Sequence, residues 1–278
     1  MRLLICNDDG VHSPGLATLA ELARHFGDVL VMAPERERSS SGHAISASVP
    51  LRCRASKAVG GCPTYRVNGT PADAVALALH LWPDIDVVLS GLNAGLNLGP
   101  AAWHSGTIAA ARQAALGGVR AIALSVPATI EGDDARVRPW IQVVLATLLE
   151  QPEGPPLVNV NVPREPRGVM WTRASTEGYD GRIIPGRDAD GREIYWFRIE
   201  PVLGVDDQAD RWAVEQGWVS MTPIALDVTD EDALEALRRV RPLDTVRAAQ
   251  LSRPVSSDAE AARVREDEIQ PPLQSPAS

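Results

Sequence analysis

The sequence predicts an α/β fold in which a doubly wound, Rossmann-like parallel sheet lies between two layers of helices. Short apolar runs without polar alternation recur along the first 163 residues, as expected for strands that are buried on both faces. Segments with apolar residues at helical spacing separate these runs, and such alternation is typical of a parallel sheet. The first three apolar runs also end in polar loops, at the strand ends where open α/β sheets bind their ligands.

Five buried strands and four helices follow from this pattern. The expected strands span residues 3–6, 29–33, 86–90, 121–125 and 157–162. The expected helices span residues 14–26, 70–81, 105–116 and 140–149. Capping signals support two of the helix starts, since Thr70 precedes a proline and Ser105 precedes Gly106 and Thr107. Residues 44–67 contain β-branched pieces broken by two glycines, which predicts a strand insertion or a hairpin.

The pattern changes after residue 163. Apolar segments at residues 183–184 and 193–199 flank a polar turn, which predicts a long β-hairpin. Its aromatic strand is more typical of packing or subunit exchange than of cofactor binding. A short helix, a strand and a last helix are expected at residues 210–216, 218–223 and 231–240. We therefore expect one domain over residues 1–252, with its core in 1–163 and a C-terminal part in 164–252, and a disordered tail over 253–278.

Composition excludes several classes of protein. A net charge of -9 and a sequence pI of about 5.1 argue against binding to a nucleic-acid polymer. No segment approaches the ~20 apolar residues of a membrane span, and the start of the chain lacks a signal peptide. Cys6, Cys53 and Cys62 are expected to be reduced thiols of a cytoplasmic protein, with a Cys53–Cys62 bridge as the alternative. The glycine-rich nucleotide-binding motifs and the G-x-S-x-G elbow are missing.

Two adjacent carboxylates, Asp8 and Asp9, follow the first buried strand. Like charges this close repel one another and raise each other's pKa unless a cation or strong hydrogen-bond donors compensate. A metal ion is the simplest compensation. An ordinary polar turn is the alternative, because Asp-Gly is a common turn dipeptide.

Other strand ends bring further polar groups to the same edge of the sheet. These groups are the Ser39 hydroxyl, the Asn93 and Asn97 carboxamides, and a helix start at Ser105, Gly106 and Thr107. Free N–H groups at a helix start favour an anion. His43 ends the serine-rich loop and is a further candidate for substrate contact. Oxygen donors without thiolates or a histidine cluster select Mg²⁺, Mn²⁺ or Ca²⁺ over Zn²⁺, and a hard cation beside an anion site is the equipment of phosphoryl transfer.

These stretches resemble the motifs of the SurE family, the stationary-phase survival proteins. The match covers about residues 1–229, and its motifs lie at residues 7–10, 33–39, 67–73, 90–99 and 105–107. The resemblance implies a metal-dependent nucleotidase that hydrolyses nucleoside 5'- and 3'-monophosphates. It implies that one divalent ion binds Asp8, Asp9, Ser39 and Asn93, and that Asn97, Ser105, Gly106 and Thr107 face the phosphate. It also implies a homodimer or homotetramer, built partly by exchange of the hairpin and C-terminal segments.

Two nucleophiles are compatible with these residues. Asp8 or Asp9 could attack phosphorus directly, or a water activated by the ion could attack instead. We favour water, because two carboxylates among neutral oxygen donors are better explained as the ion's anionic ligands. His104 is then a candidate general acid for the leaving ribose oxygen, or else a loop histidine that packs beside Trp103.

Two alternative functions remain at this stage. Residues 100–104 depart from the family pattern, so the substrate preference stays open. One alternative is a broader phosphatase that includes short polyphosphate among its substrates. The other is a protein that binds nucleotides or metal without turnover.

Overall fold

A computed structural model describes residues 1–130, 134–151, 153–176, 181–199 and 207–240 of the chain. The chain divides into two units, Met1–Asp227 and Val228–Ser278. The first unit carries the sheet and every residue of the candidate site. In the second unit the described structure is helix α6 (Glu231–Val240).

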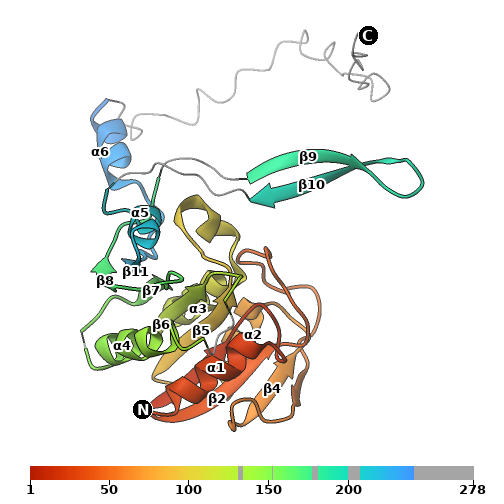
Figure 1. Cartoon of the computed structure of the whole chain (residues 1–278), viewed down its shortest axis with the longest axis vertical. Coiled ribbons are helices and arrows are strands. Elements are labelled where there is room, and N and C mark those ends of the chain that lie inside the picture. Colours follow the sequence, from red (N-terminus) through yellow and green to blue (C-terminus); the bar gives the residue numbers. More distant parts are fainter. Residues whose placement is uncertain (131–133, 152, 177–180, 200–206, 241–278) are drawn as a thin grey trace, which may run out of the picture. The chain divides into compact units, whose positions relative to one another are not determined.

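One nine-stranded sheet runs through the first unit in the order β3-β4-β2-β1-β5-β6-β7-β11-β8 (Figure 1). Its strands in chain order are β1 (Arg2–Cys6), β2 (Asp28–Pro34), β3 (Cys53–Ala55), β4 (Thr64–Val67), β5 (Val87–Ala94), β6 (Arg120–Val126), β7 (Leu157–Asn161), β8 (Gly168–Trp171) and β11 (Trp218–Pro223). The strands from β4 to β7 in the sheet are mutually parallel, so their carboxyl ends share one edge. At the borders, β3 pairs antiparallel with β4, and β11 pairs antiparallel with β7.

Helices cover both faces of this sheet. Helix α1 (Pro14–Ala23) and helix α4 (Arg138–Leu149) pack on one face, in the hydrophobic cluster that contains Leu3 and Ile5 of β1. Helix α2 (Pro71–Leu81) and helix α3 (Gly106–Leu116) pack on the other face, in the cluster that contains Leu4 and Cys6. Because successive strand residues point to opposite faces, a strand buried on both sides must be apolar throughout, as β1 is. The predicted three-layer α/β fold is confirmed.

The crossover from β6 through α4 to β7 has an unusual handedness. The steps from β5 to β6 and from β6 to β7 run in the same direction along the sheet, yet α3 and α4 lie on opposite faces. The two crossovers therefore have opposite handedness. The crossovers through α1, α2 and α3 share one handedness, and it is the right-handed form that such connections almost always take. The exception brings α4 beside α1, where Arg138 and Glu21 form an ion pair at 3.2 Å.

Four smaller elements complete the described chain. Strands β9 (Gly181–Arg187) and β10 (Glu193–Ile199) form an antiparallel hairpin. A short 3₁₀ helix, η1 (Gly99–His104), precedes α3, and helix α5 (Asp210–Glu215) precedes β11. Among the residues that the structure describes, no helix is long and apolar enough to cross a membrane.

Most predicted elements are present, with four corrections. Helix α1 ends at Ala23 rather than at Phe26, and strand β5 runs on to Ala94, four residues past its apolar run. Strand β8 was not predicted, because its four residues lack a buried apolar pattern. Ile45 and Val49, expected in a strand, lie exposed and outside the strands. The expected disordered tail lies outside the described residues, and the three cysteines form no disulfide.

Candidate active site

The loop after β1 is held against the loop after β2. Gly10 has φ of +95°, and a Cβ there would lie 3.1 Å from the carbonyl carbon of Arg36, so this close approach favours glycine. The backbone N–H of Arg38 donates to the carbonyl of Asp8 at 2.7 Å. These contacts bring the stretch that carries Ser39 to the end of β1, although the two segments are 30 residues apart in the chain.

Asp8 lies at the N-terminus of α3. The hydroxyl of Thr107 donates to its carboxylate, and the backbone N–H groups of Gly106 and Thr107 donate to it as well. A Cβ at Gly106 would come within 2.7 Å of the Cβ of Asp8, so the helix can approach this closely only with glycine there. The helix start predicted to hold a phosphate thus already holds the carboxylate of Asp8 in this structure.

Burial sets the electrostatics of the acidic pair. Burial and the nearby charge of Asp8 raise the pKa of the Asp9 carboxyl to about 6, with Glu37 adding a smaller effect in the same direction. Burial also raises the pKa of Asp8, although the hydrogen bonds from α3 oppose that shift. Two carboxyls with raised pKa values are poorly compensated by the protein alone, and a bound cation would lower both values.

Neutral oxygen donors lie beside the acidic pair. Strand β5 loses register with β6 between Ser90 and Asn93, and such bulges re-aim side chains near functional sites. The amide nitrogen of Asn93 donates to the carbonyl of Gly95 at 2.6 Å, which leaves its carbonyl oxygen as the ligand atom. Ser39 is exposed, and its hydroxyl donates to Glu37 at 2.8 Å.

The donor set suits a hard cation. Within the described residues, no group of three or more His, Cys, Asp or Glu side chains gathers where it could hold a metal ion. The oxygen atoms at this edge, two carboxylates with neutral oxygens beside them, are ligands that Mg²⁺ or Mn²⁺ prefers over those typical of Zn²⁺. Glu37 is the acidic neighbour that the sequence reasoning missed, and its position two residues before Ser39 was the available signal.

A cavity of about 270 Å³ collects most of the predicted residues. Its wall is formed by Asp8, Asp9, Ser39, Ser40, Asn93, Ala94, Gly95, Leu96, Asn97, Ala101, His104 and Ser105. Gly106 and Thr107 contact Asp8 from the first turn of α3 and are not part of that wall. His43 is not brought there either, since its ring is hydrogen-bonded to the side chain of Gln113 at 3.0 Å.

Asn97 is tied into a buried network of amides. Its side-chain nitrogen donates to the Ser125 hydroxyl at 2.8 Å, and its backbone N–H donates to the side-chain oxygen of Asn161 at 2.7 Å. Its backbone carbonyl oxygen accepts hydrogen bonds from the side-chain amides of Asn159 and Asn161 at 2.8 and 3.1 Å. The sequence reasoning missed these supporting residues, and the signal was two asparagines in an otherwise apolar strand, β7.

His104 lies on the cavity wall and contacts the hairpin. Its ring meets the ring of Phe197 edge-on, with centroids 5.9 Å apart. Trp103 is 63% exposed, and the guanidinium of Arg112 lies over its ring at 5.1 Å. The half-buried His104 therefore packs against Phe197, and it also faces the cavity that contains the acidic pair.

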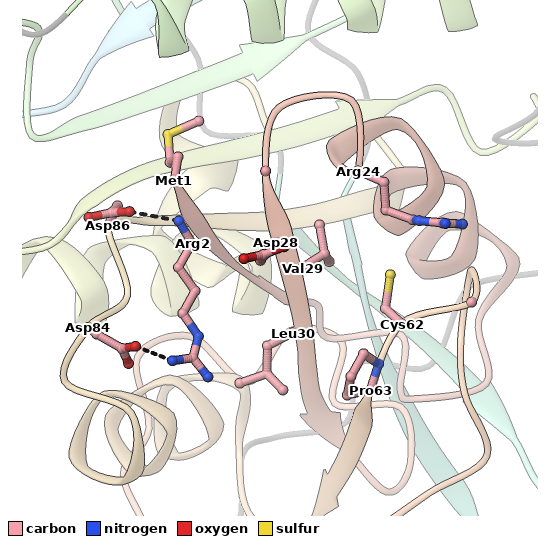
Figure 2. Close-up of a pocket in the computed structure, with 12 residues that line it drawn as sticks. Met1, Arg2, Arg24, Asp28, Val29, Leu30, Cys62, Pro63, Asp84 and Asp86 are labelled. Carbon is pink, nitrogen blue, oxygen red and sulfur yellow. Dashed lines mark hydrogen bonds and ion pairs between the residues drawn. The ribbon is translucent and has the colours of Figure 1, made fainter.

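A larger cavity, of about 800 Å³, opens at the opposite edge of the sheet, near the amino ends of β1 and β2 (Figure 2). Two of its acidic side chains contact Arg2. The guanidinium of Arg2 pairs with Asp84, and the backbone N–H of Arg2 donates to Asp86 at 2.7 Å. None of the predicted site residues lines this cavity. The side chains that line the smaller cavity, and not its volume, therefore identify it as the candidate active site.

Comparisons with known proteins agree on one family and on the fold. The family model described as survival protein SurE matches residues 3–181. The 5'-nucleotidase SurE 1 of Thermus thermophilus is 40% identical over 242 residues, which are 85% of this chain and 96% of that protein. The 5'-nucleotidase SurE of Geobacter metallireducens is 38% identical over 247 residues, 86% of this chain and 96% of that protein. The crystal structure of the SurE protein from Aquifex aeolicus matches with a TM-score of 0.71 and 31% identity, over 86% of this chain and 99% of that one.

Proposed function

Because the chain belongs to the SurE family, we propose that it is a 5'-nucleotidase that hydrolyses nucleoside monophosphates to nucleoside and phosphate. One observation carries the proposal. The buried Asp8 and the half-buried Asp9, both with raised pKa values, face the same cavity as Asn97, His104 and Ser105. Such a cavity can bind a hard cation and a phosphate side by side. The family model matches residues 3–181, a range that contains every residue of the candidate site.

We propose that one divalent ion, Mg²⁺ or Mn²⁺ with Ca²⁺ as a further option, binds Asp8, Asp9, Ser39 and Asn93. The donors are all oxygens, and the two carboxylates carry the charge that such an ion neutralises. When bound, the ion supplies Lewis acidity beside the phosphate. The proposal extends to 3'-monophosphates, which the resemblance to the family implies.

The protein's own groups have separate tasks in this mechanism. Thr107 and the amides of α3 hold the carboxylate of Asp8 in one orientation. Because Asp8 and Asp9 both serve as anionic ligands of the ion, water is the nucleophile. Asn97 and Ser105 line the same cavity and orient the phosphate. His104 is the group that can pass a proton to the leaving ribose oxygen.

We propose a homodimer or homotetramer in the cytoplasm, with no nucleic-acid polymer as partner. The support is the hairpin, which exposes apolar side chains of a kind that normally become buried. They are Ile183, Tyr195, Trp196 and Phe197, each at least 53% exposed. Apolar and aromatic side chains clustered on one exposed hairpin mark an interface.

Release of inorganic phosphate from a panel of substrates tests the proposed function. The panel contains 5'- and 3'-nucleoside monophosphates, p-nitrophenyl phosphate and short polyphosphate, each with and without Mg²⁺ or Mn²⁺. We expect metal-dependent release that is fastest from the nucleotides, and loss of that release in Asp9→Asn. Equal turnover of all esters would indicate a broader phosphatase. Nucleotide binding without phosphate release would overturn the enzymatic proposal.

A further inference from the structure

A buried carboxylate outside the cavity wall contacts the loop that forms part of that wall. Asp210, at the start of α5, is 1% exposed. One of its carboxylate oxygens accepts the backbone N–H of Gly99 at 2.8 Å. The other oxygen accepts the N–H groups of Ser175 and Arg211 at 2.9 and 2.8 Å. A buried charge that accepts three amide hydrogens joins three segments of the chain firmly.

Gly99 lies tightly against the segments that Asp210 joins to it. Its φ is +50°, and a Cβ there would lie 3.0 Å from both the Ser175 carbonyl oxygen and the Arg211 Nε atom. Glycine is thus favoured by both the backbone conformation and the space available. Gly99 is also the first residue of η1, the short helix that carries His104 and leads into Ser105.

The same loop is fixed at a second point. Asn97, two residues earlier, is held by the side chains of Asn159 and Asn161. Between these two fixed points and the N-cap at Ser105, the loop supplies the phosphate half of the cavity wall. By contrast, the four proposed metal ligands lie on other segments, at residues 8, 9, 39 and 93.

We propose that Asp210 is a positioning residue for the phosphate half of the active site: it fixes Gly99, and through η1 it sets where His104 and Ser105 stand relative to Asn97. This inference rests on the proposed function of the cavity. It predicts that phosphate binding and metal binding respond differently to a change at Asp210. A merely structural role would lower stability without separating the two affinities.

Asp210→Asn is the direct test, since it keeps the size of the side chain and replaces one acceptor oxygen with a donor. Loss of a hydrogen bond to a charged group is enough for about a tenfold change in affinity. We expect the KM for a nucleoside monophosphate and the dissociation constant of inorganic phosphate, measured at saturating Mn²⁺, to rise about tenfold. We expect the affinity for Mn²⁺, measured by calorimetry, to stay within about twofold.

Asp73→Asn is the matched control. Asp73 is 2% exposed and accepts the backbone N–H groups of Thr70 and Ser46 at 2.8 and 2.9 Å, but it supports α2 and no part of the cavity wall. This variant should lose stability as Asp210→Asn does, with unchanged KM and phosphate affinity. If the two variants behave alike, or if Asp210→Asn weakens Mn²⁺ and phosphate equally, the positioning role is wrong.

Two further measurements keep the inference testable. If Asp210→Asn does not fold, Gly99→Ala strains the same contact from the loop side and should give the same separation of phosphate and metal affinities. Unchanged phosphate affinity in Gly99→Ala would then overturn the inference. If the wild-type protein releases no phosphate from nucleotides, the proposed function fails, but the phosphate and Mn²⁺ affinities of the variants still decide the role of Asp210.

Discussion

The hydroxyl of Thr107 donates a hydrogen bond to the carboxylate of Asp8, which joins the end of β1 to the first turn of α3. Thr107 is fully buried and Asp8 is 4% exposed, so water cannot replace this bond at low cost. The contact makes the two adjacent acids different. Asp8 is held by the helix, whereas Asp9 is more exposed and has its pKa raised to about 6.

Thr107→Val should therefore damage the site without changing its charge. Valine has the shape of threonine but no hydroxyl, so Asp8 loses a hydrogen bond worth about 1.5–3 kcal/mol. We expect kcat/KM for a nucleoside monophosphate to fall by about 10- to 100-fold. Thr107→Ser keeps the hydroxyl and should retain most of the activity. A Thr107→Val enzyme with wild-type kinetics would contradict the proposed role of this bond.

Asp9→Asn should separate activity from stability. The substitution removes a proposed metal ligand, so turnover should be lost. It also removes one of two neighbouring negative charges, so the metal-free protein should melt at the same temperature or higher at pH 7.5, by about 2–4 °C for each kcal/mol of repulsion relieved. Thermal denaturation in EDTA measures the stability. A clear drop in melting temperature would show that the Asp9 carboxylate stabilises the fold by itself.

The pKa of Asp9 also predicts a dependence on pH. Its value in the folded protein, about 6, lies above its value of 3.8 in the absence of the fold, so between these values the unfolded chain loses its proton first. The contribution of Asp9 to stability therefore falls as pH rises from about 4 to about 6. The difference in free energy of unfolding between metal-free wild type and Asp9→Asn, measured in urea across this range, should follow that fall. A difference independent of pH would rule out the raised pKa.

Metal binding should show the complementary trend. A carboxylate must lose its proton before it binds a cation, so Mn²⁺ should raise the melting temperature more at pH 7.5 than at pH 5. Ser39→Ala and Asn93→Ala should reduce this effect only in part, because water can replace a neutral ligand. An equal effect of Mn²⁺ at both values of pH would place the ion away from the acidic pair.

Much of the fold could be predicted because the signals are local. Buried strands such as β1 and helix starts such as that at Thr70 are determined by neighbours in the chain. The same holds for Asp8 and Asp9, since residues after a buried parallel strand lie at the ligand-binding edge. Local sequence patterns were enough to predict most of the candidate site residues that line the cavity.

Long-range contacts were beyond such patterns. The sequence does not show that Asn97 is held by Asn159 and Asn161, or that Asp210 fixes Gly99. Each of these depends on segments more than 60 residues apart, as does the position of α4 on the face of α1. His43 is similar, because its partner Gln113 lies on a helix whose packing decides which way the ring points.

The hairpin predicts a change in assembly. Replacing residues 181–199 with a short glycine-serine linker removes four exposed apolar side chains, Ile183, Tyr195, Trp196 and Phe197. If these side chains are buried between subunits, the shortened protein should be a smaller species in light scattering. Trp196→Ser is a milder variant that should weaken the assembly in proportion. An unchanged oligomer in both would remove the hairpin from the interface.

The last prediction concerns how the ester bond is broken. With Asp8 held by α3, a water should attack phosphorus, and rapid-quench experiments should trap no covalent phosphoenzyme. His104 lies on the cavity wall and can protonate the leaving ribose oxygen, so His104→Gln should lower kcat by about 10²- to 10⁴-fold. p-Nitrophenyl phosphate is the control substrate, because its leaving group needs no proton. His104→Gln should therefore hydrolyse it at nearly the wild-type rate. Equal losses on both substrates would mean that His104, packed against Phe197, shapes the cavity and transfers no proton.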